Sequence, residues 1–148
     1  MKKIFIFLLL FISSCGYQPL YVNDIKNIEF SKITFSGEEN IGKKIINSLS
    51  IKENTLNKNL DKLDVNITYN IEETSKNSLG QITTLRSTID VNFTTRNENK
   101  NVETRNFSKN FSYQNKENKF ELINYQNNIK NNLITELIQD IRLYLNTK

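Results

Sequence analysis

The spacing of apolar residues constrains this fold most strongly, because it changes from the period of a strand to the period of a helix. Between residues 63 and 113, three stretches place apolar side chains at every second position, as half-buried strands do. The residues that share this parity are Leu63, Val65, Ile67, Tyr69 and Ile71, then Leu85, Ile89, Val91 and Phe93, and finally Phe107, Phe111 and Tyr113. Turn-forming segments at 75–80 and 97–101 separate the stretches, which predicts an antiparallel meander.

After a polar stretch at 114–119, the period becomes helical. The apolar residues of the last segment fall on one face of a helix, widened on one side. They are Leu122, Ile129, Leu133, Leu137, Ile141 and Leu145, with Ile134 and Ile138 beside them. This spacing predicts a long amphipathic helix.

Two shorter elements precede the meander. Residues 28–35 alternate imperfectly, which indicates a strand with a bulge or a change of face near Ser31 and Lys32. Ile41, Ile45 and Leu49 share one helical face, so we expect a short helix over about 40–49. Residues 50–62 fit either a weak turn of helix or an exposed loop.

The order of these elements is β-α-β-β-β-α, and it predicts the α+β class. A single small sheet of about four strands, mostly antiparallel, with two helices on one face, buries both the alternating strands and the helical stripes. We expect residues 28–148 to form this one domain.

The start of the chain has a different character. Lys2 and Lys3 precede nine apolar residues, 4–12, whose helix would rise only about 14 Å, less than half the thickness of a bilayer's hydrocarbon core. Ser13, Ser14 and then Cys15 follow, so residues 1–14 are expected to be a signal peptide and Cys15 the acylated residue of a lipobox. The alternative is an ordinary signal peptide with an incidental cysteine. Residues 15–27, which contain Pro19, would be an extended tether.

The composition excludes several chemistries. The chain has no His and one Cys among 148 residues, which excludes a Ser-His-Asp triad, a Cys-His dyad and the usual zinc sites. Removal of Lys2 and Lys3 would leave 18 basic against 16 acidic residues, a balance that does not favour nucleic-acid binding. The 24 Asn residues are scattered among periodic apolar ones, which favours a coding bias over a prion-like tract. We therefore expect no enzyme activity, cofactor or metal.

One motif resembles a known family. The segment from Cys15 to Tyr21, Cys-Gly-Tyr-Gln-Pro-Leu-Tyr, is similar to the acylated start of the LPS-assembly lipoproteins of the LptE family. The order of the elements is similar too, as are Gly80-Gln81 before a strand and Phe107 with Phe111 at the end of the last strand.

This resemblance implies a non-enzymatic role at the outer membrane. Such a protein would be anchored by acyl chains at Cys15, face the periplasm and the barrel lumen, plug and support the assembly of the LptD-type β-barrel, and bind lipopolysaccharide (LPS). An acid directly after the cysteine would favour the inner membrane, whereas this chain has Gly16. The alternative is an outer-membrane adaptor for a different envelope complex.

The predicted topology also suggests where LPS phosphates would bind. In an up-down-up meander, the turn at 75–80 and the exit at 114–119 lie at the same end of the sheet. Lys76, Lys116 and Lys119 are therefore candidate phosphate ligands, while Arg96 and Lys100 lie at the opposite end. The alternative is that these three are solvated lysines in loops.

Overall fold

The order of the elements agrees with the prediction, except that the first predicted strand is divided in two and one short strand follows the first helix. The structure is a computed structural model that describes residues 28–97 and 101–147, so the expected signal peptide, Cys15, the tether and Lys100 lie outside the described residues. The elements are β1 (Glu29–Phe30), β2 (Lys32–Gly37), α2 (Glu39–Ser48), β3 (Lys52–Glu53), β4 (Lys62–Lys76), β5 (Ile82–Arg96), β6 (Val102–Gln114) and α3 (Lys119–Asn146).

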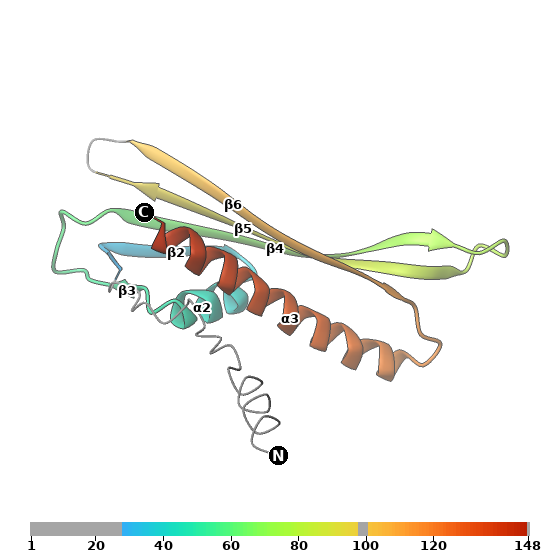
Figure 1. Ribbon diagram of the computed structural model, residues 1–148. Helices are drawn as coiled ribbons and strands as arrows, with labels where there is room; N and C mark the ends of the chain where they lie inside the picture. The colour runs from blue at the N-terminus through green and yellow to red at the C-terminus, as the bar shows by residue number, and fades with distance from the viewer. Residues whose placement is uncertain (1–27, 98–100, 148) are drawn as a thin grey trace, which may run out of the picture.

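The main sheet has the strand order β2-β4-β5-β6. β2 runs parallel to β4, whereas β4 with β5 and β5 with β6 are antiparallel. The three meander strands are 13 to 15 residues long, so they form a long, twisted ribbon (Figure 1). The α+β class and the mostly antiparallel sheet are confirmed.

Both helices lie on the same side of the sheet (Figure 1). The odd-numbered residues of the strands point toward them, and the alternation seen in the sequence becomes the division between core and solvent. The core consists of Ile41, Ile45, Ile46, Leu49 and Ile51 around α2, Leu63, Val65, Ile67, Leu85, Ile89, Val91, Phe93 and Tyr113 from the sheet, and Ile129, Leu133, Ile134, Leu137 and Ile141 from α3.

α2 packs closely against the sheet because Gly42 has no side chain. A Cβ at this position would lie 2.6 Å from Ile67 Cδ1 and 2.8 Å from Phe35 Cδ1. Gly42 is itself buried, between Ile41 and Ile45 on the same helix. The glycine therefore sets how near the helix comes to β2 and β4.

The first predicted strand is divided at Ser31. β1 pairs in parallel with β3 in a separate two-stranded sheet, and β2 joins β4. The Ser31 amide and hydroxyl both donate to the carbonyl oxygen of Asp61, at 2.8 and 3.2 Å. This confirms the expected change near Ser31 and Lys32, while the second sheet is an addition to the prediction. After β3, the chain forms an exposed loop in which Leu56 is 94% accessible.

α3 covers the sheet unevenly. Its buried residues begin at Ile129, ten positions after its first residue, and its first turns lie away from the β4–β5 ribbon (Figure 1). The Asn118 side chain caps the helix by accepting from the amides of Phe120 and Glu121. Neither α2 nor α3 combines the length and apolar character of a membrane-spanning helix.

Candidate functional site

The turn after β4 and the exit from β6 lie at one end of the sheet, as the topology predicted. The Asn115 amide donates to the Thr83 carbonyl at 2.9 Å, and Asn115 Nδ2 donates to the Ile82 carbonyl at 3.0 Å. A shallow depression of about 560 Å³ lies between the two segments, and Asn77 and Lys116 are among its lining residues. We call this region, with Lys76, Lys116 and Lys119, the distal end.

The candidate lysines of the distal end differ in their surroundings. Lys76 Nζ lies 3.1 Å from a carboxylate oxygen of Glu73. Lys116 Nζ lies 3.6 Å from Glu121 and 5.1 Å from the centre of the Tyr125 ring. Lys119 is the first residue of α3. Two of the three cations are thus partly neutralised by neighbouring carboxylates, although the lysine of each pair remains at least 41% exposed.

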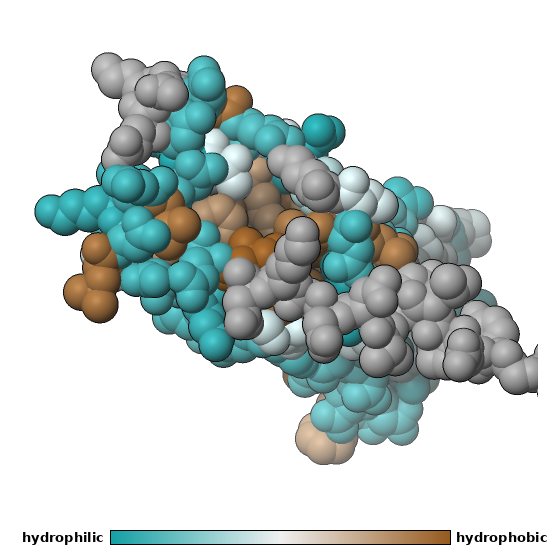
Figure 2. Space-filling view, turned by 60° about the vertical axis from the view of Figure 1, so that its left-hand side comes forward, coloured by the Kyte–Doolittle hydropathy of each residue, from teal (hydrophilic) through white to brown (hydrophobic). Residues whose placement is uncertain are grey.

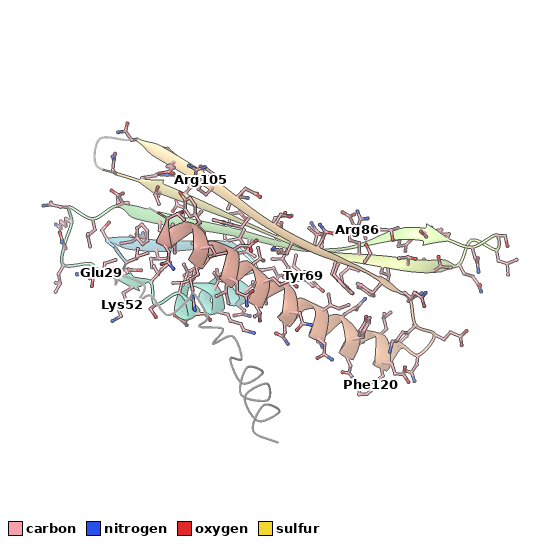
Figure 3. The ribbon with its side chains drawn as sticks, viewed as in Figure 1. Glu29, Lys52, Tyr69, Arg86, Arg105 and Phe120 are labelled. Atoms are coloured by element: carbon pink, nitrogen blue, oxygen red, sulfur yellow. The ribbon has the colours of Figure 1, made fainter. Side chains whose placement is uncertain are left out.

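Exposed apolar side chains occur on the strands and the helix that carry or adjoin these cations. Because α3 leaves the sheet here, Ile71 and Phe111 remain 43% and 48% accessible on the face that elsewhere forms the core. Phe120 and Ile123, in the first turns of α3, are 73% and 55% accessible, and Figure 3 places Phe120 at the start of this helix. Cations beside apolar surface suit a phosphorylated amphiphile.

A buried chain of hydroxyl groups marks the place where α3 leaves the sheet. Ser87 is fully buried, and its Oγ lies 3.4 Å from Tyr69 Oη and 3.1 Å from Tyr113 Oη. Tyr113 Oη also accepts from Gln126 Nε2 at 3.0 Å. The sequence analysis missed Ser87, because a serine in an alternating strand resembles an interruption of the apolar pattern.

The other side of the sheet is polar and bears no helix (Figure 1). We call it the open face. Its even-numbered residues are mostly Asn, Thr, Ser and charged residues that bond across strands: Asn106 Nδ2 donates to Asn92 Oδ1 at 2.7 Å, and Arg86 Nε donates to Ser112 Oγ at 3.1 Å. Figure 3 shows Arg86 on the side of the sheet away from α3.

The opposite end of the sheet carries a larger depression, of about 760 Å³. We call it the proximal pocket. Its cationic lining residues are Lys32, Lys58, Lys62 and Arg96, and Leu60 and Val102 are apolar. With this end of the molecule turned forward, Figure 2 shows a largely hydrophilic surface with a hollow in which apolar residues are visible. The sequence analysis placed Arg96 at this end, but it missed the pocket, because the parallel register of β2 with β4 is not evident from periodicity.

Two titratable groups of the described residues have shifted pKa values, and both belong to β6. In residues 28–97 and 101–147, no three acidic or cysteine side chains gather as a metal site would require. The hydrogen bond to Asp140 raises the pKa of Lys109, and hydrogen bonds to Tyr144 and Glu103 raise the pKa of Arg105. Both shifts favour the charged form of side chains that are already charged at neutral pH. They therefore stabilise contacts of β6 and do not produce a general base for catalysis.

Comparisons with known proteins reveal a shared fold. No protein-family model matches the chain, and no curated protein matches its sequence. Among solved structures, rare lipoprotein B from Shewanella oneidensis is similar with a TM-score of 0.59 and 9% identity, over 78% of this chain and 94% of that one. A minor lipoprotein from Acinetobacter baumannii gives a TM-score of 0.51 and 17% identity, over 80% and 92%. A putative lipoprotein from Caulobacter crescentus gives 0.52 and 13%, over 79% and 89%. The chain thus has the fold of these bacterial lipoproteins.

Proposed function

We propose that this protein is a non-enzymatic outer-membrane lipoprotein that plugs an LptD-type β-barrel, supports its assembly and binds LPS during transport. The observation that carries this proposal is the open face. A sheet with strands of 13 to 15 residues leaves one whole side uncovered by any described element, and that side is polar.

The chemistry of the open face suits the inside of a barrel. The inner wall of a wide transmembrane barrel is polar, because lipid-facing and lumen-facing residues alternate along each strand. Side-chain amides and hydroxyls both donate and accept hydrogen bonds, so they adapt to such a wall. The row formed by Asn70, Thr88 and Asn110 crosses three adjacent strands and provides this chemistry at the middle of the open face.

The anchor and the fold support the same location. The three similar structures are lipoproteins, and Cys15 follows Ser13 and Ser14 as an acylated cysteine would. Two or three acyl chains hold a protein stably to a membrane. Mass spectrometry of the protein extracted from membranes is expected to find an acylated Cys15 at the mature N-terminus. An intact, unmodified N-terminal segment in functional protein would exclude this anchor.

In this proposal, LPS binds at the distal end. Lys76, Lys116 and Lys119 offer positive charge to phosphate groups, and exposed Phe111 and Phe120 offer apolar contact to acyl chains. Charge-assisted bonds to phosphate are stronger than bonds between neutral groups. Because acids already neutralise two of the lysines, a phosphate must compete with Glu73 and Glu121 there.

The decisive experiment disturbs the open face without changing the core. In the double variant N70R/N110R, two long cations project from the middle of the open face, so co-purification with the co-expressed barrel is expected to fall at least tenfold. The matched control is N128R/N132R, which makes the same changes at two exposed positions on α3. Equal recovery of the barrel with both variants would contradict the plug role, and recovery of a different envelope protein through the open face would favour an adaptor.

A further inference from the structure

We propose that the proximal pocket is a second anion site, which binds the phosphate group of a ligand through Lys32, Lys62 and Arg96, with Lys58 as a fourth cation in its lining. This inference goes beyond the proposed LPS contact, which lies at the other end of the sheet.

The three strand cations form one row across the sheet. Lys32 of β2 is in register with Lys62 of β4, and Lys62 is in register with Arg96 of β5. Arg96 is in turn in register with Val102 of β6. Neighbouring strands lie about 4.8 Å apart, so the outer two cations start about 10 Å from each other. All three even-numbered residues lie on the open face, where long side chains can converge on one phosphate.

The charge in this pocket is poorly balanced. Arg96 Nη2 lies 3.0 Å from Asp64 Oδ2, and both side chains are more than a third exposed. No carboxylate is among the described residues that line the pocket, and Asp61 beside it contributes its backbone carbonyl to Ser31. Lys32, Lys58 and Lys62 form no ion pair with any carboxylate of the described residues, whereas Lys76 and Lys116 at the distal end each have one.

The row of Lys32, Lys62 and Arg96 is expected to lower the stability of the unliganded fold. Like charges directly opposite each other on neighbouring strands destabilise a sheet, and here two such pairs follow one another. Elsewhere on the open face, residues in register bond to each other, as Thr94 and Thr104 do at 3.2 Å. A bound anion would remove the repulsion, because a phosphate oxygen can accept from lysine and arginine together.

The pocket also offers apolar contact. Leu60 and Val102 line it beside the cations, and Val102 is 60% accessible. This combination suits a phosphate that carries an apolar stem better than an isolated ion. The structure begins at Ile28, which bonds to Lys52 near this end.

An anionic lipid headgroup is within reach of this pocket if Cys15 is acylated. Ile28 lies thirteen positions after Cys15, and an extended chain of that length spans at most about 45 Å. Only the choice of a lipid headgroup as the source of the phosphate group depends on the proposed acylation of Cys15. Free phosphate has the same recognition chemistry, so the experiment must separate the two sources.

The test titrates the full chain, purified in a non-ionic detergent, with short-chain phosphatidylglycerol and separately with inorganic phosphate, followed by calorimetry. The variant K32Q/K62Q is expected to bind at least tenfold more weakly than the wild type, and the matched control K43Q/K44Q, at two exposed lysines of α2 outside both anion sites, less than threefold more weakly. Binding of the lipid alone identifies a headgroup site, and equal binding of inorganic phosphate identifies a site for soluble phosphate. Binding of neither probe, or equal weakening in both variants, would overturn the proposal.

Folding provides a second readout. Without ligand, K32Q/K62Q is expected to unfold at the same temperature as the wild type or a higher one, because repulsion is removed. A lower unfolding temperature would mean that the lysines stabilise the fold and would count against a binding role. The barrel test remains separate, because N70R/N110R changes the middle of the open face and is expected to retain phosphate binding.

Discussion

Gly37 and Gly80 have the same backbone conformation in different surroundings. Both have φ near +77°, but a Cβ at Gly37 would overlap the carbonyl oxygen of Ile67, whereas nothing lies within 4 Å of one at Gly80. The left-handed conformation costs a residue with a side chain about 1 kcal/mol or more. Gly80→Ala is therefore expected to lower the free energy of unfolding by about 1 kcal/mol, and Gly37→Ala by at least about 3 kcal/mol.

Urea unfolding monitored by circular dichroism measures this pair directly. Similar losses for the two variants would show that the carbonyl of Ile67 moves aside readily. The sequence predicted the turn that contains Gly80, but it did not show that Gly37 meets a backbone carbonyl.

Ser87 connects two tyrosines in the buried hydroxyl chain. Ser87→Ala would leave Tyr69 and Tyr113 without their shared partner, and the loss of a buried hydrogen bond costs about 1 kcal/mol. We expect a loss of about 1 to 2 kcal/mol by urea unfolding. Tyr69→Phe, which removes only the longer 3.4 Å contact, should cost less. A larger loss from Tyr69→Phe would mean that the Tyr69 hydroxyl makes a stronger bond than its 3.4 Å distance to Ser87 indicates.

At the scale of elements, β6 and α3 are joined by the ion pair between Lys109 and Asp140, whose atoms lie 2.8 Å apart. The hydrogen bond to Asp140 raises the pKa of Lys109. A raised pKa in the folded state contributes stability that is fully present below the unfolded pKa of lysine, about 10.4, and that disappears as pH rises through the folded value.

The difference in unfolding free energy between the wild type and Lys109→Met is therefore expected to be constant from about pH 7 to 9 and to shrink above about pH 10.4. Urea titrations at these pH values measure it. The variant Asp140→Asn should abolish the same dependence, and a difference that persists unchanged at high pH would show that Lys109 contributes through its alkyl chain.

The elements that could be predicted are those long enough to repeat their period. The alternation from Leu63 to Tyr69 and the stripe from Ile129 to Ile141 describe the core directly, because burial on one face requires those spacings. The division at Ser31 was visible as a break in parity. The two-residue strand β3 was not visible, since its pairing with β1 depends on a tertiary contact and not on its own sequence.

At the scale of the whole molecule, the ends of the sheet have different charge arrangements. The antiparallel meander could be predicted from its turns, so the distal lysines were found before the structure. The proximal pocket needed the parallel pairing of β2 with β4, which joins residues 30 positions apart and has no local signal. Two candidate anion sites therefore lie at opposite ends of one sheet.

The distal site leads to a prediction about LPS affinity. If Lys76, Lys116 and Lys119 meet phosphates, each contributes roughly 1 kcal/mol, or less where it is exposed. Changing all three to Glu also places acids beside Glu73 and Glu121, so LPS affinity is expected to fall at least about tenfold. Salt should weaken wild-type binding, because exposed charges are screened within about 8 Å at physiological ionic strength.

The control for this measurement reverses Lys43, Lys44 and Lys52, three exposed lysines outside both anion sites. Surface binding assays with purified LPS report the affinities. An equal loss in the control would show that overall charge governs binding, and no loss in either variant would remove LPS from the distal end while the plug role stays testable through the open face.

The last prediction separates anchoring from recognition. The buried core of the described residues lies between Ile41 and Ile141, so we expect the domain to bury its apolar surface without acyl chains. The open face, in turn, belongs to the strands and not to the tether. If an ordinary signal peptide replaces residues 1–15, the exported soluble domain should still co-purify with a co-expressed barrel, at reduced yield because it loses the high local concentration of a membrane anchor.

The same soluble domain with N70R/N110R should lose the barrel altogether. If the normally folded soluble domain fails to form the complex at all, the acyl chains are part of the interface. The main contact with the barrel would then lie in the membrane-proximal segment and not on the open face.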